Sequence, residues 1–199
     1  MISNLKNLFA SKAGLMSLAR LFVMLILTVW YSFFLLRPIT MIRADVGRHI
    51  RNGEILLSTP IGGWNKILQT NFYSYTNPDF SFINHHWGSG IIFYLIWKVA
   101  GLTGLAIFSI SLNLLTFFIF FHLAKKKAGF YTASLVTLFL IPLIAERTEI
   151  RPEIFSYLLS AIFFWLLLRY RFESLPSPSE GRRGGEERWL LLLIPLQAL

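Results

Sequence analysis

The side chains best suited to chemistry lie in one polar stretch of the chain, residues 37–87. Asp45 stands there between Arg43 and Arg48, with His49 four positions further on. A carboxylate in such a place can accept the proton of an acceptor hydroxyl, which is the work of a general base. It can equally pair with Arg48 or cap a short helix, and the sequence leaves these possibilities open.

The same stretch holds four potential ligands of a metal ion, namely Asp45, His49, His85 and His86. Asp45 and His49 are one helical turn apart, and this set of nitrogen and oxygen atoms suits zinc or manganese. Adjacent histidines do not easily bind one metal, so hydrogen bonding at a polar–aromatic surface is favoured and no metal site is predicted. Trp87 is typical of a membrane-interface anchor, and aromatic faces also stack on sugars.

A second group of charges lies further along the chain, where Arg147 and Arg151 are separated by one helical turn. Paired arginines suit the recognition of a phosphate through forked, charge-assisted hydrogen bonds. The alternative is a charge network with the neighbouring acidic residues Glu146, Glu149 and Glu153.

The composition restricts the kind of protein that positions these residues. The chain has 199 residues, of which 55% are hydrophobic and only 15% are charged, with a net charge of +9 and no cysteine. A soluble domain carries about a quarter charged residues. Disorder is excluded by the apolar content, and the lack of cysteine excludes disulfides, thiolate metal sites and a cysteine nucleophile. We predict an all-α, polytopic transmembrane protein in the lipid bilayer, with no nucleic-acid partner.

Apolar runs of helical length predict about four membrane spans. They cover residues 21–36, 105–123, 130–145 and 154–168. Residues 90–97 are too few to span and are predicted to lie at the interface or to lead at an angle into the next span. In the large first extracytoplasmic loop, residues 42–57 predict a short helix with an apolar and a charged face.

These runs divide the chain into segments. We expect a cytoplasmic N-terminus at 1–20, a membrane domain at 21–168 with its outer loop at 37–87, and a cytoplasmic linker at 169–188. Residues 189–199 begin a further apolar run, so the sequence is expected to be a fragment of a larger protein.

Basic residues set the orientation. With the N-terminus in the cytoplasm, the inner segments hold the larger share of the 19 Lys and Arg residues, as the positive-inside rule requires. They are Lys6, Lys12, Arg20, Lys125, Lys126, Lys127, Arg169, Arg171, Arg182, Arg183 and Arg188. The predicted location is therefore the cell membrane, with the loop at 37–87 on the outer side. The apolar runs contain no acidic residue, which argues against a transporter.

Four short segments resemble the GT-C superfamily of integral-membrane glycosyltransferases, which includes protein O-mannosyltransferases and aminoarabinose transferases. The similarity is greatest to uncharacterised bacterial members and extends from Arg20 to about Leu168. The segments are residues 45–54 (DVGRHIRNGE), 71–76 (NFYSYT), 84–87 (NHHW) and 151–156 (RPEIFS).

The resemblance implies transfer of a sugar from a polyprenyl-phosphate donor to an acceptor on the extracytoplasmic face, in the cell envelope. Asp45 would be the base or the residue that orients the acceptor, and Arg151 would meet the lipid phosphate. The predicted substrate-binding residues are Arg48, His49, His85, His86, Trp87, Arg147 and Arg151. The alternative is a non-catalytic membrane protein of the same fold that binds a lipid carrier or an assembly partner. A transporter fragment is the third possibility, and the sequence identifies no cofactor.

Overall fold

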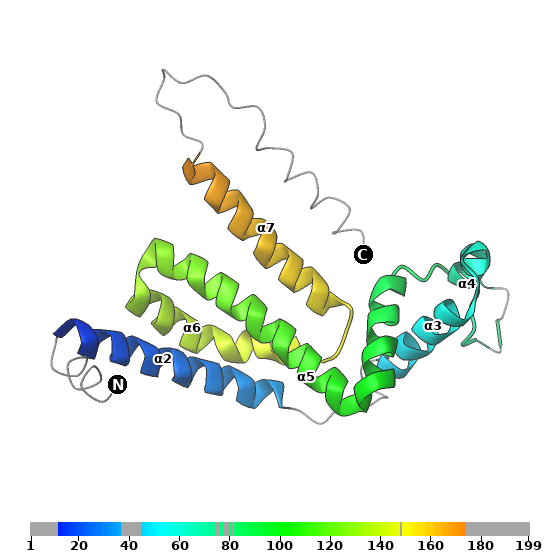
Figure 1. Ribbon diagram of the computed structural model, residues 1–199, viewed down its shortest axis with the longest axis horizontal. Helices are drawn as coiled ribbons and strands as arrows, with labels where there is room; N and C mark the ends of the chain where they lie inside the picture. Colours follow the sequence, from blue (N-terminus) through cyan, green and yellow to red (C-terminus); the bar gives the residue numbers. More distant parts are fainter. Residues whose placement is uncertain are drawn as a thin grey trace, which may run out of the picture. The chain divides into compact units, whose positions relative to one another are not determined.

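The computed structural model describes residues 12–36, 45–74, 76–77, 80, 82–147 and 149–173 (Figure 1). Within that part every regular element is helical, so the predicted all-α class is confirmed. The elements in chain order are α2 (Lys12–Leu35), α3 (Val46–Ser58), η1 (Ile61–Gly63), α4 (Trp64–Gln69), α5 (Trp87–Ala128), α6 (Phe130–Ile144), η2 (Ala145–Arg147) and α7 (Glu153–Glu173). The predicted segment at 189–199 lies outside the described residues, as does all but the start of the linker at 169–188.

The chain forms two compact units, each of which is described by itself. The first unit contains α2, the last part of α5 from Leu114, α6 and η2. Its interior is apolar and aromatic: Tyr31 of α2 packs on Phe117 of α5 with ring centroids 5.3 Å apart. Leu27, Phe121 and Ile141 are also buried. Such packing stabilises a helix bundle through burial and close contact of apolar side chains.

A tight turn joins α5 to α6 in this unit. Gly129 adopts a φ of 79°, a conformation that glycine reaches without steric cost. The three lysines 125–127 occupy the last turn of α5, where positive charge interacts favourably with the helix dipole. Phe121 and Phe130 meet edge to face across the turn, at 5.9 Å.

The second unit contains α3, η1, α4, the first part of α5 and α7. Its core is formed by buried apolar residues of α3, of α5 and of the chain that enters α7. They are Val46, Ile50, Phe93, Leu105, Ile150 and Ile154, with Phe155 packed against them. The helix predicted at 42–57 is present as α3, which begins at Val46; residues 42–44 lie outside the described part.

The long helix α5 is interrupted at Gly101. This residue has φ 62° and ψ −160°, so the helical geometry stops there and resumes at once. The segment at 90–97 and the predicted span at 105–123 are therefore parts of one kinked element. The part after the kink, residues 102–128, is about 40 Å long, which exceeds the roughly 30 Å of a bilayer's hydrocarbon core.

Two of the described helices, α2 and α5, are long and apolar enough to cross a membrane. Their surfaces carry large exposed apolar side chains, such as Phe22 and Leu21 on α2. The apolar helix α6 has 15 residues and is about 22 Å long, shorter than that core. The expected number of about four spans stays a prediction.

Candidate functional site

Asp45 immediately precedes α3 in an unusual backbone conformation. Its φ of 53° and ψ of 16° lie in the left-handed region, and it is the one non-glycine residue with positive φ among the described residues. Aspartate tolerates this region better than most residues, but the conformation is still costly and such residues concentrate at functional sites.

The side chain of Asp45 points to solvent and pairs with Arg48. The carboxylate is two-thirds exposed, and its Oδ2 lies 3.2 Å from Nη2 of Arg48. It makes no capping hydrogen bond to α3, although its backbone carbonyl accepts one from the N–H of His49 at 3.1 Å. Of the two structural alternatives raised by the sequence, the ion pair is therefore present and the side-chain cap is not.

His49 lies on the buried side of α3. Only 4% of its surface is exposed, and its Nδ1 atom is buried with no hydrogen-bond partner. Burial, followed by the positive charge of Arg48 and by His86, lowers the pKa of His49 from 6.5 to about 4. The negative charges of Asp45 and Glu153 act in the opposite direction with smaller effect. The imidazole is therefore neutral at pH 7.

The histidines of the NHHW segment complete this cluster. The ring of His86 lies edge-on to His49 at 5.8 Å and is 3.9 Å from the ring of His85. Burial, followed by the proximity of His85, lowers the pKa of His86, with Glu153 acting in the opposite direction. Trp87, the first residue of α5, packs edge to face on Trp64 at 5.7 Å. In the described part of the chain, no three His, Asp or Glu side chains are grouped so as to hold a metal ion.

Two residues that were not predicted as site residues connect a second segment to α3. The hydroxyl of Tyr73 donates a hydrogen bond of 2.7 Å to Oδ1 of the buried Asn52 and lies 3.3 Å from the carbonyl oxygen of Arg48. Burial raises the pKa of Tyr73, which therefore stays a hydrogen-bond donor at neutral pH. The clue in the sequence was the position of Tyr73 within the NFYSYT segment.

Close helix packing holds His49 beside His86. A Cβ atom added to Gly53 of α3 would lie 2.1 Å from the carbonyl oxygen of Gly90 in α5. A Cβ added to Gly90 would in turn lie 2.9 Å from the carbonyl oxygen of His49. Since only glycine fits at such a crossing, these two positions fix the approach of α3 to α5.

The two candidate phosphate-binding arginines are placed differently from the prediction. Arg151 belongs to the second unit, where its Nη2 lies 2.7 Å from Oε2 of Glu149, so part of the alternative charge network is present. Arg147 ends η2 in the first unit, and its side chain is outside the described set. Residues 149–152 are not helical, so the predicted one-turn spacing of the arginines is wrong.

Comparison of the chain with protein-family models, with curated proteins and with solved structures gave no match. The geometry nevertheless groups Asp45, Arg48, His49, His85 and His86 in one unit. It combines an exposed carboxylate and its guanidinium partner with a buried, neutral imidazole that both of them influence electrostatically. Such a group can take up a proton at the carboxylate and bind an anionic or hydroxylated ligand.

Proposed function

We propose that this chain is part of a multi-pass membrane glycosyltransferase of the GT-C type, with its N-terminus in the cytoplasm. It would transfer a sugar from a polyprenyl-phosphate donor to an acceptor on the extracytoplasmic face. The membrane location is supported by the length and apolar surface of α2 and α5. Exposed apolar surface on this scale is costly in water and favourable in lipid.

The observation that carries the proposed chemistry is the meeting of the four segments of the GT-C resemblance. Residues of all four belong to the second unit, although they are spread from position 45 to position 156. Tyr73 bonds to Asn52, His86 lies against His49, and Phe155 packs on the core shared by α3 and α5. Segments that are distant in sequence and combine charged, histidine and aromatic side chains are typical of a binding or catalytic site.

In the proposed reaction the Asp45 carboxylate accepts the proton of the acceptor hydroxyl. The hydroxyl oxygen forms a bond to the anomeric carbon of the sugar, while the bond from that carbon to the phosphate oxygen breaks. The electron pair of the broken bond stays on the lipid phosphate. Arg48 keeps N–H donors beyond the one that faces Asp45, and these could stabilise the phosphate charge.

The remaining predicted residues would bind substrate. His49, His85 and His86 supply polar ring atoms next to Asp45, and Trp87 supplies an aromatic face for a sugar. Arg151 would release its ion-pair partner Glu149 and bind the lipid phosphate instead. Arg147 is proposed to bind the same phosphate, and this proposal rests only on its position in the sequence.

Asp45→Asn tests the proposal, because it keeps the size of the side chain and removes the base. Sugar transfer from a panel of polyprenyl-phosphate sugars is measured with the full-length protein in liposomes. We expect a loss of about 100-fold or more, the usual contribution of a general base. Undiminished transfer by Asp45→Asn would sink the assignment.

Glu54→Gln is the matched control, since Glu54 is a carboxylate on α3, the helix that begins directly after Asp45, and is paired with Arg51 at the same spacing of three residues. Its transfer rate is expected to equal that of the wild type.

The non-catalytic alternative is favoured by one observation, the ion pairs that already occupy both Asp45 and Arg151. A wild-type protein that binds the polyprenyl phosphate, but transfers no sugar from any donor in the panel, would establish the alternative. Carrier binding is measured with the same liposomes.

A further inference from the structure

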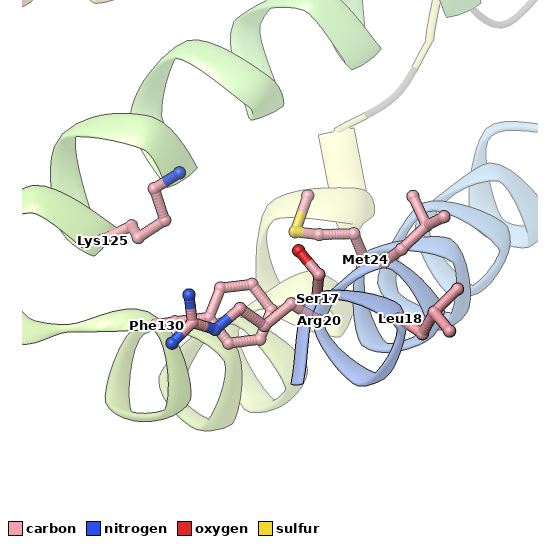
Figure 2. Close-up of a pocket in the computed structure, with 7 residues that line it drawn as sticks. Ser17, Leu18, Arg20, Met24, Lys125 and Phe130 are labelled. Carbon is pink, nitrogen blue, oxygen red and sulfur yellow. The ribbon is translucent and has the colours of Figure 1, made fainter. Parts of the chain in front are cut away.

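An open cleft of about 710 Å³ lies in the first unit among α2, α5 and α6 (Figure 2). Its lining combines apolar and polar side chains. The lining residues are Ser17, Leu18, Arg20, Leu21, Met24, Lys125 and Phe130. None of them belongs to the candidate site in the second unit.

Neither cation of the cleft forms an ion pair with another of the residues that the structure describes, so both are available to an anion. The guanidinium of Arg20 lies over the ring of Phe130, 5.9 Å from its centroid, which orients it without neutralising its charge. Figure 2 shows Lys125 reaching into the same space from α5, with the hydroxyl of Ser17 between the helices. The side chains of Arg20 and Lys125 are both exposed.

The charged residues at the end of the first unit that contains the cleft are all basic. Lys12, Arg20 and the lysines at 125–127 all lie here, and the one acidic residue in the unit's sequence, Glu146, follows the opposite end of α6. The cleft therefore lies in a positive potential, and its charge is complementary to an anion.

The level of the cleft matches the headgroup region of a bilayer. Arg20 is followed by the apolar part of α2, which runs to Leu35 and is about 23 Å long. This is slightly less than the hydrocarbon core, so Arg20 is placed where the chain leaves the lipid tails. Lys125 and Phe130 flank the turn between α5 and α6 at the same end of the unit.

We infer that this cleft binds the phosphate headgroup of an anionic phospholipid on the cytoplasmic side of the membrane. Arg20, Lys125 and the Ser17 hydroxyl donate to the phosphate oxygens, while an acyl chain lies along Leu21 and Met24. Basic pockets between apolar helices are suited to anionic lipid headgroups on that side. The inference rests on the membrane location proposed above and is independent of glycosyl transfer.

The experiment measures lipid retention by native mass spectrometry of the full chain. Dioleoyl phosphatidylglycerol and dioleoyl phosphatidylcholine are titrated separately, since they share acyl chains and differ in charge. The wild type is expected to prefer phosphatidylglycerol. Each cation in direct contact with the lipid phosphate is expected to contribute about fivefold in binding, so Arg20→Gln/Lys125→Gln should bind phosphatidylglycerol about 30-fold more weakly.

Lys12→Gln/Lys126→Gln is the matched control, because it removes the same charge from exposed lysines that do not line the cleft. It is expected to lose less than about fivefold, the contribution of a single specific contact. The charge-conserving variant Arg20→Lys/Lys125→Arg is expected to keep the preference. If the glutamine double variant aggregates, the two single variants are measured, each with an expected loss of about fivefold.

Three results of this lipid titration would overturn the inference. One is equal retention of the two lipids by the wild type, and another is an equal loss in the control variant. The third is displacement of phosphatidylglycerol by glycerol 3-phosphate at the same concentration, which would mean that the phosphate alone is recognised. Lipid retention needs no sugar donor, so failure of the glycosyltransferase proposal leaves it unchanged. A chain washed off neutral vesicles by alkaline carbonate would overturn both proposals.

Discussion

The two units of the molecule are built from the same kind of helix and yet differ in chemistry. The first unit is apolar along its helices, and its described lysines, Lys12 and Lys125 to Lys127, lie at one end. The second unit buries one histidine and three asparagines, His49, Asn52, Asn84 and Asn113, and it exposes three ion pairs. Buried polar groups cost free energy unless they are partnered, so a fold retains them where they have a use.

This difference indicates that the two units have different roles. Apolar side chains on the surface of the first unit favour lipid, while the second unit gathers the groups able to bind a polar substrate and move a proton. Identical substitutions in the two units should therefore have different consequences.

The largest difference is expected for phenylalanine. Phe93 of α5 in the second unit is fully buried, whereas Phe139 of α6 in the first unit is 71% exposed. Phe93→Ala should lower the free energy of unfolding by about 4 kcal/mol through lost burial and the cavity that remains. Phe139→Ala should change it by less than about 1 kcal/mol. Unfolding in detergent micelles measures both, and equal losses would contradict the comparison.

Acid should destabilise the second unit through His49. The pKa of this residue is about 4 in the folded protein and 6.5 in its ordinary state, so the unfolded chain binds the proton more readily. The contribution of neutral His49 to the free energy of unfolding is therefore fully present above pH 6.5, and it falls as the pH is lowered towards 4. The loss is limited to roughly 3 kcal/mol by the size of the shift.

His49→Gln removes this titration, and its unfolding should depend less on pH between 6.5 and 4 than that of the wild type. Ser89→Ala is the control, because it removes a buried polar side chain of the same unit that does not titrate in this range, so its pH dependence should equal that of the wild type. An unchanged pH profile in His49→Gln would show that other groups are responsible.

The smallest effect is expected for the hydroxyl of Tyr73. Tyr73→Phe leaves Oδ1 of the buried Asn52 without this donor and should destabilise the fold by about 1 kcal/mol. Tyr157→Phe, at a half-exposed position in α7 of the same unit, should cost less than about 0.5 kcal/mol. The difference between the two melting temperatures in detergent measures the hydrogen bond, and no difference would mean that water replaces it.

The sequence was sufficient for the helical class and for much of the placement of the helices. The apolar run from Leu21 and the amphipathic pattern around Ile50 both appear as helices, because the period of apolar residues is a local property. An angle between the segment at 90–97 and the following span was one of the two alternatives that the sequence offered, but the sequence did not identify Gly101 as the residue where the helix breaks.

The geometry of the candidate site was harder to predict from the sequence than the helices were. The pairing of Asp45 with Arg48 followed from their spacing, and the structure contains it. The burial of His49 and its contact with His86 depend on helix packing between positions far apart in the chain. The non-helical chain at 149–152 depends on where the helices begin and end, which periodicity fixes poorly.

The left-handed backbone at Asp45 has an evolutionary consequence. Glycine adopts this conformation without strain, and asparagine tolerates it well, so either would suit the backbone at least as well as aspartate. Selection for a stable, abundant protein therefore favours glycine or asparagine at position 45, whereas selection for the proposed activity favours aspartate. In a library selected only for expression, glycine and asparagine are expected to accumulate at position 45, whereas selection for activity is expected to keep aspartate.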